Sequence, residues 1–100
     1  MTINNQTEGT TLTMAIEGRI DTQTAPDLEK TIKESIEGVT DLILDFTEVL
    51  YVSSAGLRTI LTAQNWMEDK KGTMVIKGAR KNIKDVFKVT GFDTFLNLED

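Results

Sequence analysis

The stretch LILDFTEVLYVSSAGLRTIL, residues 42–61, decides the fold of this chain. Its first five residues, 42–46, are almost all apolar, and the run is short and bounded by polar residues. That pattern is typical of a central strand covered on both faces. Residues 49–52 form a second short apolar segment. The small residues 53–56 then open a helix whose apolar positions recur every three or four residues, so the stretch predicts a strand that leads directly into a helix.

The flanking sequence continues this alternation of strands and helices. Residues 2–6 and 11–20 predict a hairpin, because apolar side chains in the second segment fall on alternate positions. A helix is expected after Pro26, with Thr24 as its N-cap. Downstream, the pattern predicts a strand at 73–77, a short helix at 83–90 and an apolar tail at 92–98 that docks on the domain with room for an edge strand.

The order of these elements predicts an α/β fold in a single domain, residues 1–100. Strands that alternate with helices after a hairpin indicate a mixed β-sheet of four to five strands with three to four helices. The pattern alone leaves open whether helices cover one face of the sheet or both. Alternation in the segment 11–20 favours a lightly covered face.

Composition excludes several classes of function. The chain has no cysteine and no histidine, which removes disulfides, thiolate metal sites and Ser-His-Asp catalysis. A formal net charge of −5 argues against direct binding of nucleic acid. The chain also lacks a membrane-length apolar run and a signal-peptide pattern, so we expect a cytoplasmic protein with no membrane association, no metal and no cofactor.

Little acid-base material is available for catalysis, and we expect the chain not to be an enzyme. A serine hydrolase is disfavoured because the nucleophile elbow Gly-x-Ser-x-Gly is absent, and no nucleotide-binding glycine motif is present. The only plausible acid-base residues are Asp21, Asp45, Lys77 and Tyr51.

The segment Ser53-Ser54-Ala55-Gly56 is the first candidate site, at the predicted junction of strand and helix. One interpretation is purely structural, in which a serine caps the helix and small residues allow a tight turn. The other is regulatory, because a phosphate added there brings roughly −1.5 to −2 charges on an exposed loop. The two interpretations are compatible.

Three further positions are candidates with strong structural alternatives. Asp21 and Thr22 follow the first long strand, and an aspartate there commonly hydrogen-bonds its own backbone. Asp45, near the end of an apolar strand, is interpreted as a polar group that faces a loop. Trp66 lies off the apolar stripe of its helix, so it either anchors a partner or covers the edge of the core.

Several of these segments together resemble a known family, the STAS-domain anti-sigma factor antagonists. The resemblance rests on residues 18–21 (GRID), 25–28 (APDL), 42–46 (LILDF) and 51–58 (YVSSAGLR), and it covers the chain from about Leu12 to Phe95. It implies a mixed sheet with helices packed mainly on one face. It also implies a protein that binds an anti-sigma factor, itself an ATP-binding serine kinase with a histidine-kinase-like fold, and thereby releases a sigma factor.

The resemblance further implies a phosphorylation switch. The phosphoacceptor corresponds to Ser54, with Ser53 as second choice because family members commonly carry aspartate at that position. Phosphorylation ends binding, and a PP2C-type phosphatase restores it. The implied partner-binding residues are Asp21, Thr22, Ser53, Ser54, Ala55, Gly56, Leu57 and Arg58.

One alternative within the same fold stays open. STAS-like domains also resemble parts of transporters and of lipid-transport complexes, so the chain could be a non-phosphorylated binding module of a transport or signalling complex.

Overall fold

The computed structural model describes residues 1–100. In chain order its elements are β1 (Thr2–Glu8), β2 (Thr11–Ile20), α1 (Ala25–Ser35), β3 (Asp41–Val52), α2 (Ser54–Asp69), β4 (Thr73–Lys77), α3 (Lys81–Thr90), a 3-10 turn η1 (Phe92–Thr94) and β5 (Asn97–Glu99). The strands form one sheet in the order β1-β2-β3-β4-β5, in which β1 runs antiparallel to β2 and the other neighbours are parallel. The predicted mixed sheet is therefore confirmed.

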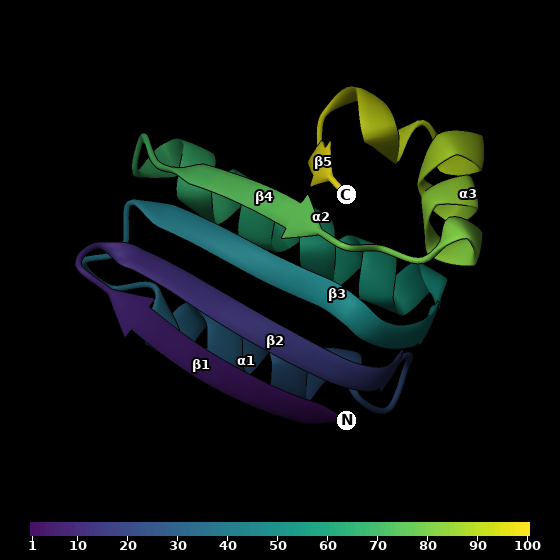
Figure 1. The fold of residues 1–100 in the computed structure, drawn as a ribbon, viewed down its shortest axis with the longest axis horizontal. Coiled ribbons are helices and arrows are strands. Elements are labelled where there is room, and N and C mark those ends of the chain that lie inside the picture. The colour runs from purple at the N-terminus through teal and green to yellow at the C-terminus, as the bar shows by residue number, and fades with distance from the viewer.

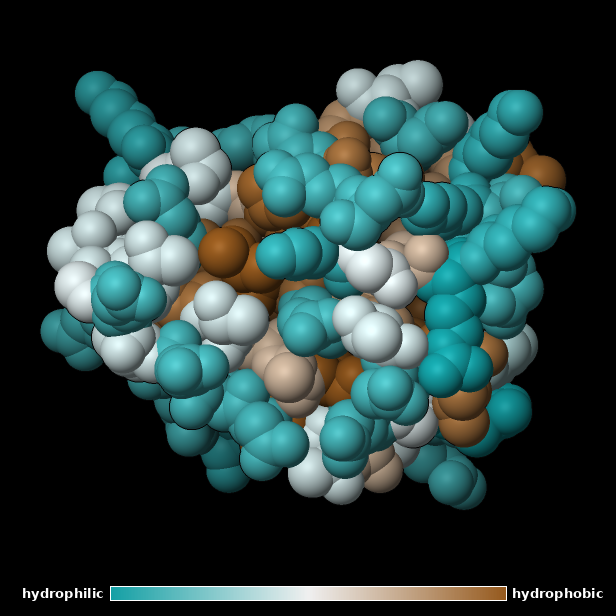
Figure 2. Space-filling model, in the orientation of Figure 1, coloured by the Kyte–Doolittle hydropathy of each residue, from teal (hydrophilic) through white to brown (hydrophobic).

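Helices α1 and α2 lie together on one face of the sheet (Figure 1), as the resemblance implied. Each connects a strand to the next parallel strand in the same direction across the sheet, from β2 to β3 and from β3 to β4. Crossovers of one hand that step in one direction must pass on the same side of the sheet. The opposite face is left uncovered, and Figure 2 shows it as mostly hydrophilic, with hydrophobic atoms visible between polar side chains.

The expectation that residues 42–46 are covered on both faces is therefore wrong. Leu42, Leu44 and Phe46 are buried beneath the helices, whereas Ile43 and Asp45 are half-buried on the uncovered face. Burial alternates along residues 42–46, although the sequence is almost entirely apolar, because Ile43 places an apolar side chain on the uncovered face.

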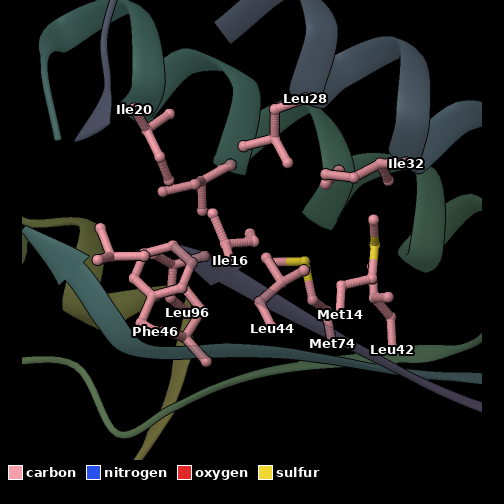
Figure 3. Close-up of a cluster of buried hydrophobic side chains, with 14 of the residues drawn as sticks. Met14, Ile16, Ile20, Leu28, Ile32, Leu42, Leu44, Phe46, Met74 and Leu96 are labelled. Carbon is pink, nitrogen blue, oxygen red and sulfur yellow. The ribbon is translucent and has the colours of Figure 1, made fainter. Parts of the chain in front are cut away.

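The core lies between the helices and the covered face of the sheet (Figure 3). Leu28 and Ile32 of α1 are fully buried and face the side chains of β2, among them Met14 and Ile16. Each such side chain contributes roughly 1.5–3 kcal/mol through removal of apolar surface from water.

None of the helices combines the length and apolarity needed to cross a bilayer.

The apolar tail docks on this core only in part. Leu96 is buried and Phe92 packs against the core, as expected, and β5 pairs with β4. Phe95 instead is 52% exposed and meets the ring of Phe92 edge to face, with 5.7 Å between ring centroids.

Strand β3 is a single element of 12 residues, not two short apolar segments. Its pairing with β2 slips twice: Ala15 and Glu17 face Asp45 and Glu48, and one step later Gly18 and Arg19 face Val49 and Tyr51. In each interval β3 holds one more residue than β2, which is the mark of a β-bulge.

These bulges change the spacing of buried residues along β3. Side chains 42, 44 and 46 are buried at a period of two, and then 49 and 52 at a period of three. The strand therefore keeps apolar side chains on the face that meets the core over its whole length. A strict period of two would have turned Val49 away from the helices and brought Glu48 and Leu50 toward them.

Asp45 holds the first bulge. Its carboxylate accepts hydrogen bonds from the Thr47 hydroxyl at 2.6 Å and from the Thr47 backbone N–H at 3.0 Å. The Thr47 hydroxyl and N–H, in that order, lower the pKa of Asp45 below its ordinary value, with a smaller contribution from the charge of Lys77. Asp45 is thus a structural acceptor.

Asp45→Ala is expected to lower the free energy of unfolding at neutral pH by about 1 kcal/mol, because two partly solvated hydrogen bonds are lost. Since the folded-state pKa of Asp45 is lowered, this contribution is complete above the ordinary value of 3.8 and disappears as pH falls through the folded-state pKa. Urea unfolding at neutral and acidic pH measures the difference. Asp69→Ala, at an exposed aspartate with no hydrogen bond or ion pair, is the control, and an equal loss in both variants at neutral pH would contradict this role for Asp45.

Candidate functional site

Ser53 links the end of β3 to the start of α2. Its backbone is extended, with φ −86° and ψ 176°, and its Oγ accepts a hydrogen bond from the Gly56 N–H at 3.3 Å. Its own backbone N–H donates to the Ile20 carbonyl at 2.9 Å. Ser53 therefore is the N-cap of α2 and ties that helix to the end of β2.

Ser54 is the first residue of α2 and differs from its neighbour in every relevant respect. Its side chain is exposed, and its hydroxyl makes no hydrogen bond within the chain. The structural interpretation of this segment therefore applies to Ser53. The cap belongs to the half-buried Ser53, and the free hydroxyl belongs to Ser54.

Gly56 allows the first turn of α2 to lie directly on the end of β2. A Cβ atom at this position would stand 2.8 Å from both the Ile20 carbonyl oxygen and the Ile20 Cγ2, and 2.9 Å from the Val52 Cγ1. Non-bonded carbon atoms prefer separations of about 3.5–4.0 Å, so no side chain fits. Gly56 is required here for close approach rather than for its backbone flexibility.

The loop after β2 is held by the Asp21 side chain. Its Oδ1 accepts hydrogen bonds from the backbone N–H groups of Gln23 at 3.0 Å and Thr24 at 3.2 Å. The hydrogen bond from the Thr24 N–H is the largest cause that lowers the pKa of Asp21 below its ordinary value, although partial desolvation opposes it. The Asp21 carboxylate therefore orders its own loop, as the structural interpretation of this residue expected.

Thr24 precedes α1, but its side chain does not cap that helix as expected. The Thr24 hydroxyl instead donates to the Arg19 carbonyl at 2.8 Å and accepts from the Asp21 N–H at 2.9 Å. Because the hydroxyl is used to close the loop on the end of β2, it is not available to the first turn of α1.

Arg19 is shared between Asp21 and an aromatic ring. Its Nε lies 3.7 Å from the Asp21 Oδ2, and its guanidinium carbon lies 4.3 Å from the centroid of the Tyr51 ring. The Asp21 charge is thus already balanced by a cation within the same loop region.

The two loops meet at an open depression of about 290 Å³ between the first turns of α1 and α2. Thr22 and Arg58 lie on its rim. Its lining residues are Thr22, Ala25, Pro26, Glu29, Ala55, Arg58 and Thr59. The Thr59 hydroxyl reaches the Ala25 carbonyl at 3.5 Å, which joins the two helices beneath the depression.

Of the predicted partner-binding set, the structure therefore places Thr22, Ala55 and Arg58 on the depression. The exposed Ser54 and the half-buried Asp21 do not line it, but each is the chain neighbour of a residue that does. Gly56 and Leu57 are buried, so they support this surface from below. Four lining residues, Ala25, Pro26, Glu29 and Thr59, were missed, because only the packing of α1 against α2 places them there.

The four residues considered for acid-base catalysis do not meet. Asp45 and Lys77 are register partners on neighbouring strands, whereas Asp21 and Tyr51 lie near the carboxyl ends of β2 and β3. Six residues of strand separate Asp45 from Tyr51, which is about 20 Å. Trp66 is half-buried and packs against the core, so it covers a core edge.

Comparison with known proteins gives a consistent result. The family model described as "STAS domain" matches residues 2–100. A relative from Bordetella bronchiseptica with the name "Putative anti-sigma factor antagonist BtrV" is 27% identical over 82 residues, which are 81% of this chain and 71% of the relative.

Solved structures share the fold. An anti-sigma factor antagonist from Mycobacterium paratuberculosis superposes with a TM-score of 0.87 at 23% identity, over 98% of this chain and 84% of the other. The Bacillus cell fate determinant SpoIIAA in its phosphorylated form superposes with a TM-score of 0.77 at 17% identity, over 97% and 90%. At these identities the likeness establishes the arrangement of strands and helices.

Gly56→Ala is expected to destabilise the fold by about 1–3 kcal/mol, because the new methyl group overlaps the Ile20 carbonyl and its neighbours. This loss occurs although alanine is the better helix former. Urea denaturation measures it. Ser54→Ala, a change of similar size on the exposed side of the same turn, is the control and should change stability by less than about 0.5 kcal/mol. Equal stability of Gly56→Ala and the parent would refute the close-approach argument.

Proposed function

This chain belongs to the STAS domain family, and we propose that it acts as an anti-sigma factor antagonist whose binding is switched off by phosphorylation of Ser54. In the unmodified form it binds an anti-sigma factor that is also an ATP-binding serine kinase with a histidine-kinase-like fold, and so frees a sigma factor. A PP2C-type phosphatase returns the modified protein to the binding form. Binding and phosphorylation take place in the cytoplasm.

The separation of the two serine roles is the observation that carries this proposal. Ser54 offers an exposed hydroxyl that makes no hydrogen bond and lies next to Ala55 of the depression in the chain, whereas Ser53 is committed to the cap. A kinase can approach Ser54 without opening the fold. The relative BtrV bears the name of an anti-sigma factor antagonist, and a structural neighbour is known in a phosphorylated form, which supports the same assignment.

A phosphate at Ser54 weakens the complex by charge and by bulk. It adds roughly −1.5 to −2 charges at neutral pH to a protein of formal net charge −5. A partner that fits closely over Thr22 and Ala55 must then accommodate the new group or leave it buried and unpaired. A cost of about 3 kcal/mol lowers affinity more than a hundredfold.

A transport-associated binding module is the second candidate, because the STAS domain of a SulP transporter from Vibrio cholerae shares the fold, with a TM-score of 0.68 at 19% identity over 86% of this chain and 70% of the other. The name of the sequence relative favours the antagonist. Capture of a transport subunit, with no kinase partner, would support the second candidate instead.

Phosphorylation is expected at Ser54 and not at Ser53. When the protein is incubated with its anti-sigma factor kinase and ATP, mass spectrometry should locate one phosphate on Ser54, and Ser54→Ala should abolish labelling. Ser53→Ala should keep the phosphate on Ser54 while it lowers stability by about 1 kcal/mol, since the cap is lost. Full labelling of Ser54→Ala at another residue would show that the assignment is wrong.

Ser54→Glu is expected to weaken binding to the kinase partner at least tenfold, because it places a negative charge on the contact surface. Calorimetry with the purified partner measures the dissociation constant. Asn65→Glu adds the same charge to an exposed position farther along α2 and should leave affinity within about twofold. If both variants bind like the parent, Ser54 does not lie at the interface.

A further inference from the structure

Arg58 is the one cationic side chain that lines the depression. It is exposed and takes part in none of the five ion pairs of the chain, and its guanidinium makes no hydrogen bond within the protein. An unpaired guanidinium has five N–H donors in a planar array that suits phosphate oxygens. This donor array faces solvent beside the proposed modification site.

Ser54 and Arg58 are four residues apart in α2. Side chains at this spacing lie on the same side of a helix, with Cβ atoms about 5–6 Å apart. A phosphoserine is long enough to meet an arginine at that separation, so the pair can form without any change in the backbone.

The other charges around the depression leave Arg58 as the available cation. Arg19 is occupied by Asp21 and by the Tyr51 ring, and the Asp21 carboxylate is itself bonded to its own loop. Glu29, on the side of the depression formed by α1, repels a dianion. A phosphate on Ser54 is therefore drawn along α2 toward Arg58, which lines the depression.

We propose that Arg58 binds the phosphate of phosphorylated Ser54 and holds it over the depression, so that the protein closes its own docking surface. The biological role of this pair rests on the proposed function, but the pairing itself follows from the geometry of α2. The phosphate then acts in two ways: it brings negative charge, and it occupies the space between Thr22 and Ala55 that a partner would fill. Arg58 is a positioning residue for the modification.

The test uses full-length protein with phosphoserine incorporated genetically at position 54, so it does not depend on any kinase. The second ionisation of the phosphate is followed by 31P NMR as a function of pH. An adjacent guanidinium stabilises the dianion, so Arg58→Gln should raise the pKa of this step by about half a pH unit. Arg58→Lys should keep most of the parent value, and Lys33→Gln, an exposed change of equal charge on α1, should leave it unchanged.

A second readout locates the phosphate. In the parent, phosphoserine at 54 should shift the backbone amide signals of Thr22 and Ala55 in heteronuclear NMR spectra, and Arg58→Gln should reduce those shifts. Should Arg58→Gln prove poorly folded, Arg58→Ala supplies the same comparison. The same phosphate pKa in the parent and in the variant that removes the guanidinium overturns the pairing. Failure of kinase labelling at Ser54 would refute the proposed function and leave this result standing.

Discussion

The close contact between the end of β2 and the first turn of α2 is the constraint on which the rest of the surface depends. It needs a residue without a side chain at position 56, because Ile20 and Val52 already occupy the space that a Cβ atom would take. It also needs the Ser53 N–H to reach the Ile20 carbonyl at 2.9 Å. With these two conditions met, the loop that follows Ile20 must emerge beside the start of α2, and the depression between the two helices is the result.

Electrostatics at this surface follows from which groups are already satisfied. Asp21 has its hydrogen bonds within its loop and its counter-charge in Arg19. Ser53 has its bond to Gly56. The Ser54 hydroxyl and the Arg58 guanidinium, in contrast, have no partner within the chain, and the same holds for the Thr22 hydroxyl and the Glu29 carboxylate on the depression.

Much of the fold could be predicted from sequence, because hydrophobic period and turn residues agree in most segments. The hairpin, the order of strands and helices and the end of α3 at Gly91 all follow from local pattern, and Gly91 adopts the left-handed conformation typical of a helix end. Strand β3 was read as two pieces because its bulges change the period from two to three at Phe46. A bulge depends on pairing with β2, so no window of sequence reports it directly.

The polar residues proposed for the candidate site could be predicted from the sequence, whereas the α1 residues that line the depression could not. Ser54, Asp21 and Arg58 were found from a motif and a family resemblance, whereas Pro26 and Glu29 entered only through the packing of α1 against α2. Thr24 shows the same limit. A threonine before a helix suggests a cap, yet its hydroxyl bonds the Arg19 carbonyl because the loop returns to β2. In both cases, contacts between segments that are distant in the sequence determine where the side chain lies.

The parallel pairing of β2 with β3 affects how the chain folds. Each residue of β2 is bonded to a strand about 30 positions later, as in Thr11 with Asp41 and Ile20 with Val52. Pairings of such long sequence separation form late and cooperatively during folding, because the intervening chain must be ordered first. The surface between α1 and α2 needs both strands in place, so an incompletely folded chain does not display it. The shape of this surface therefore depends on pairing between segments far apart in the sequence.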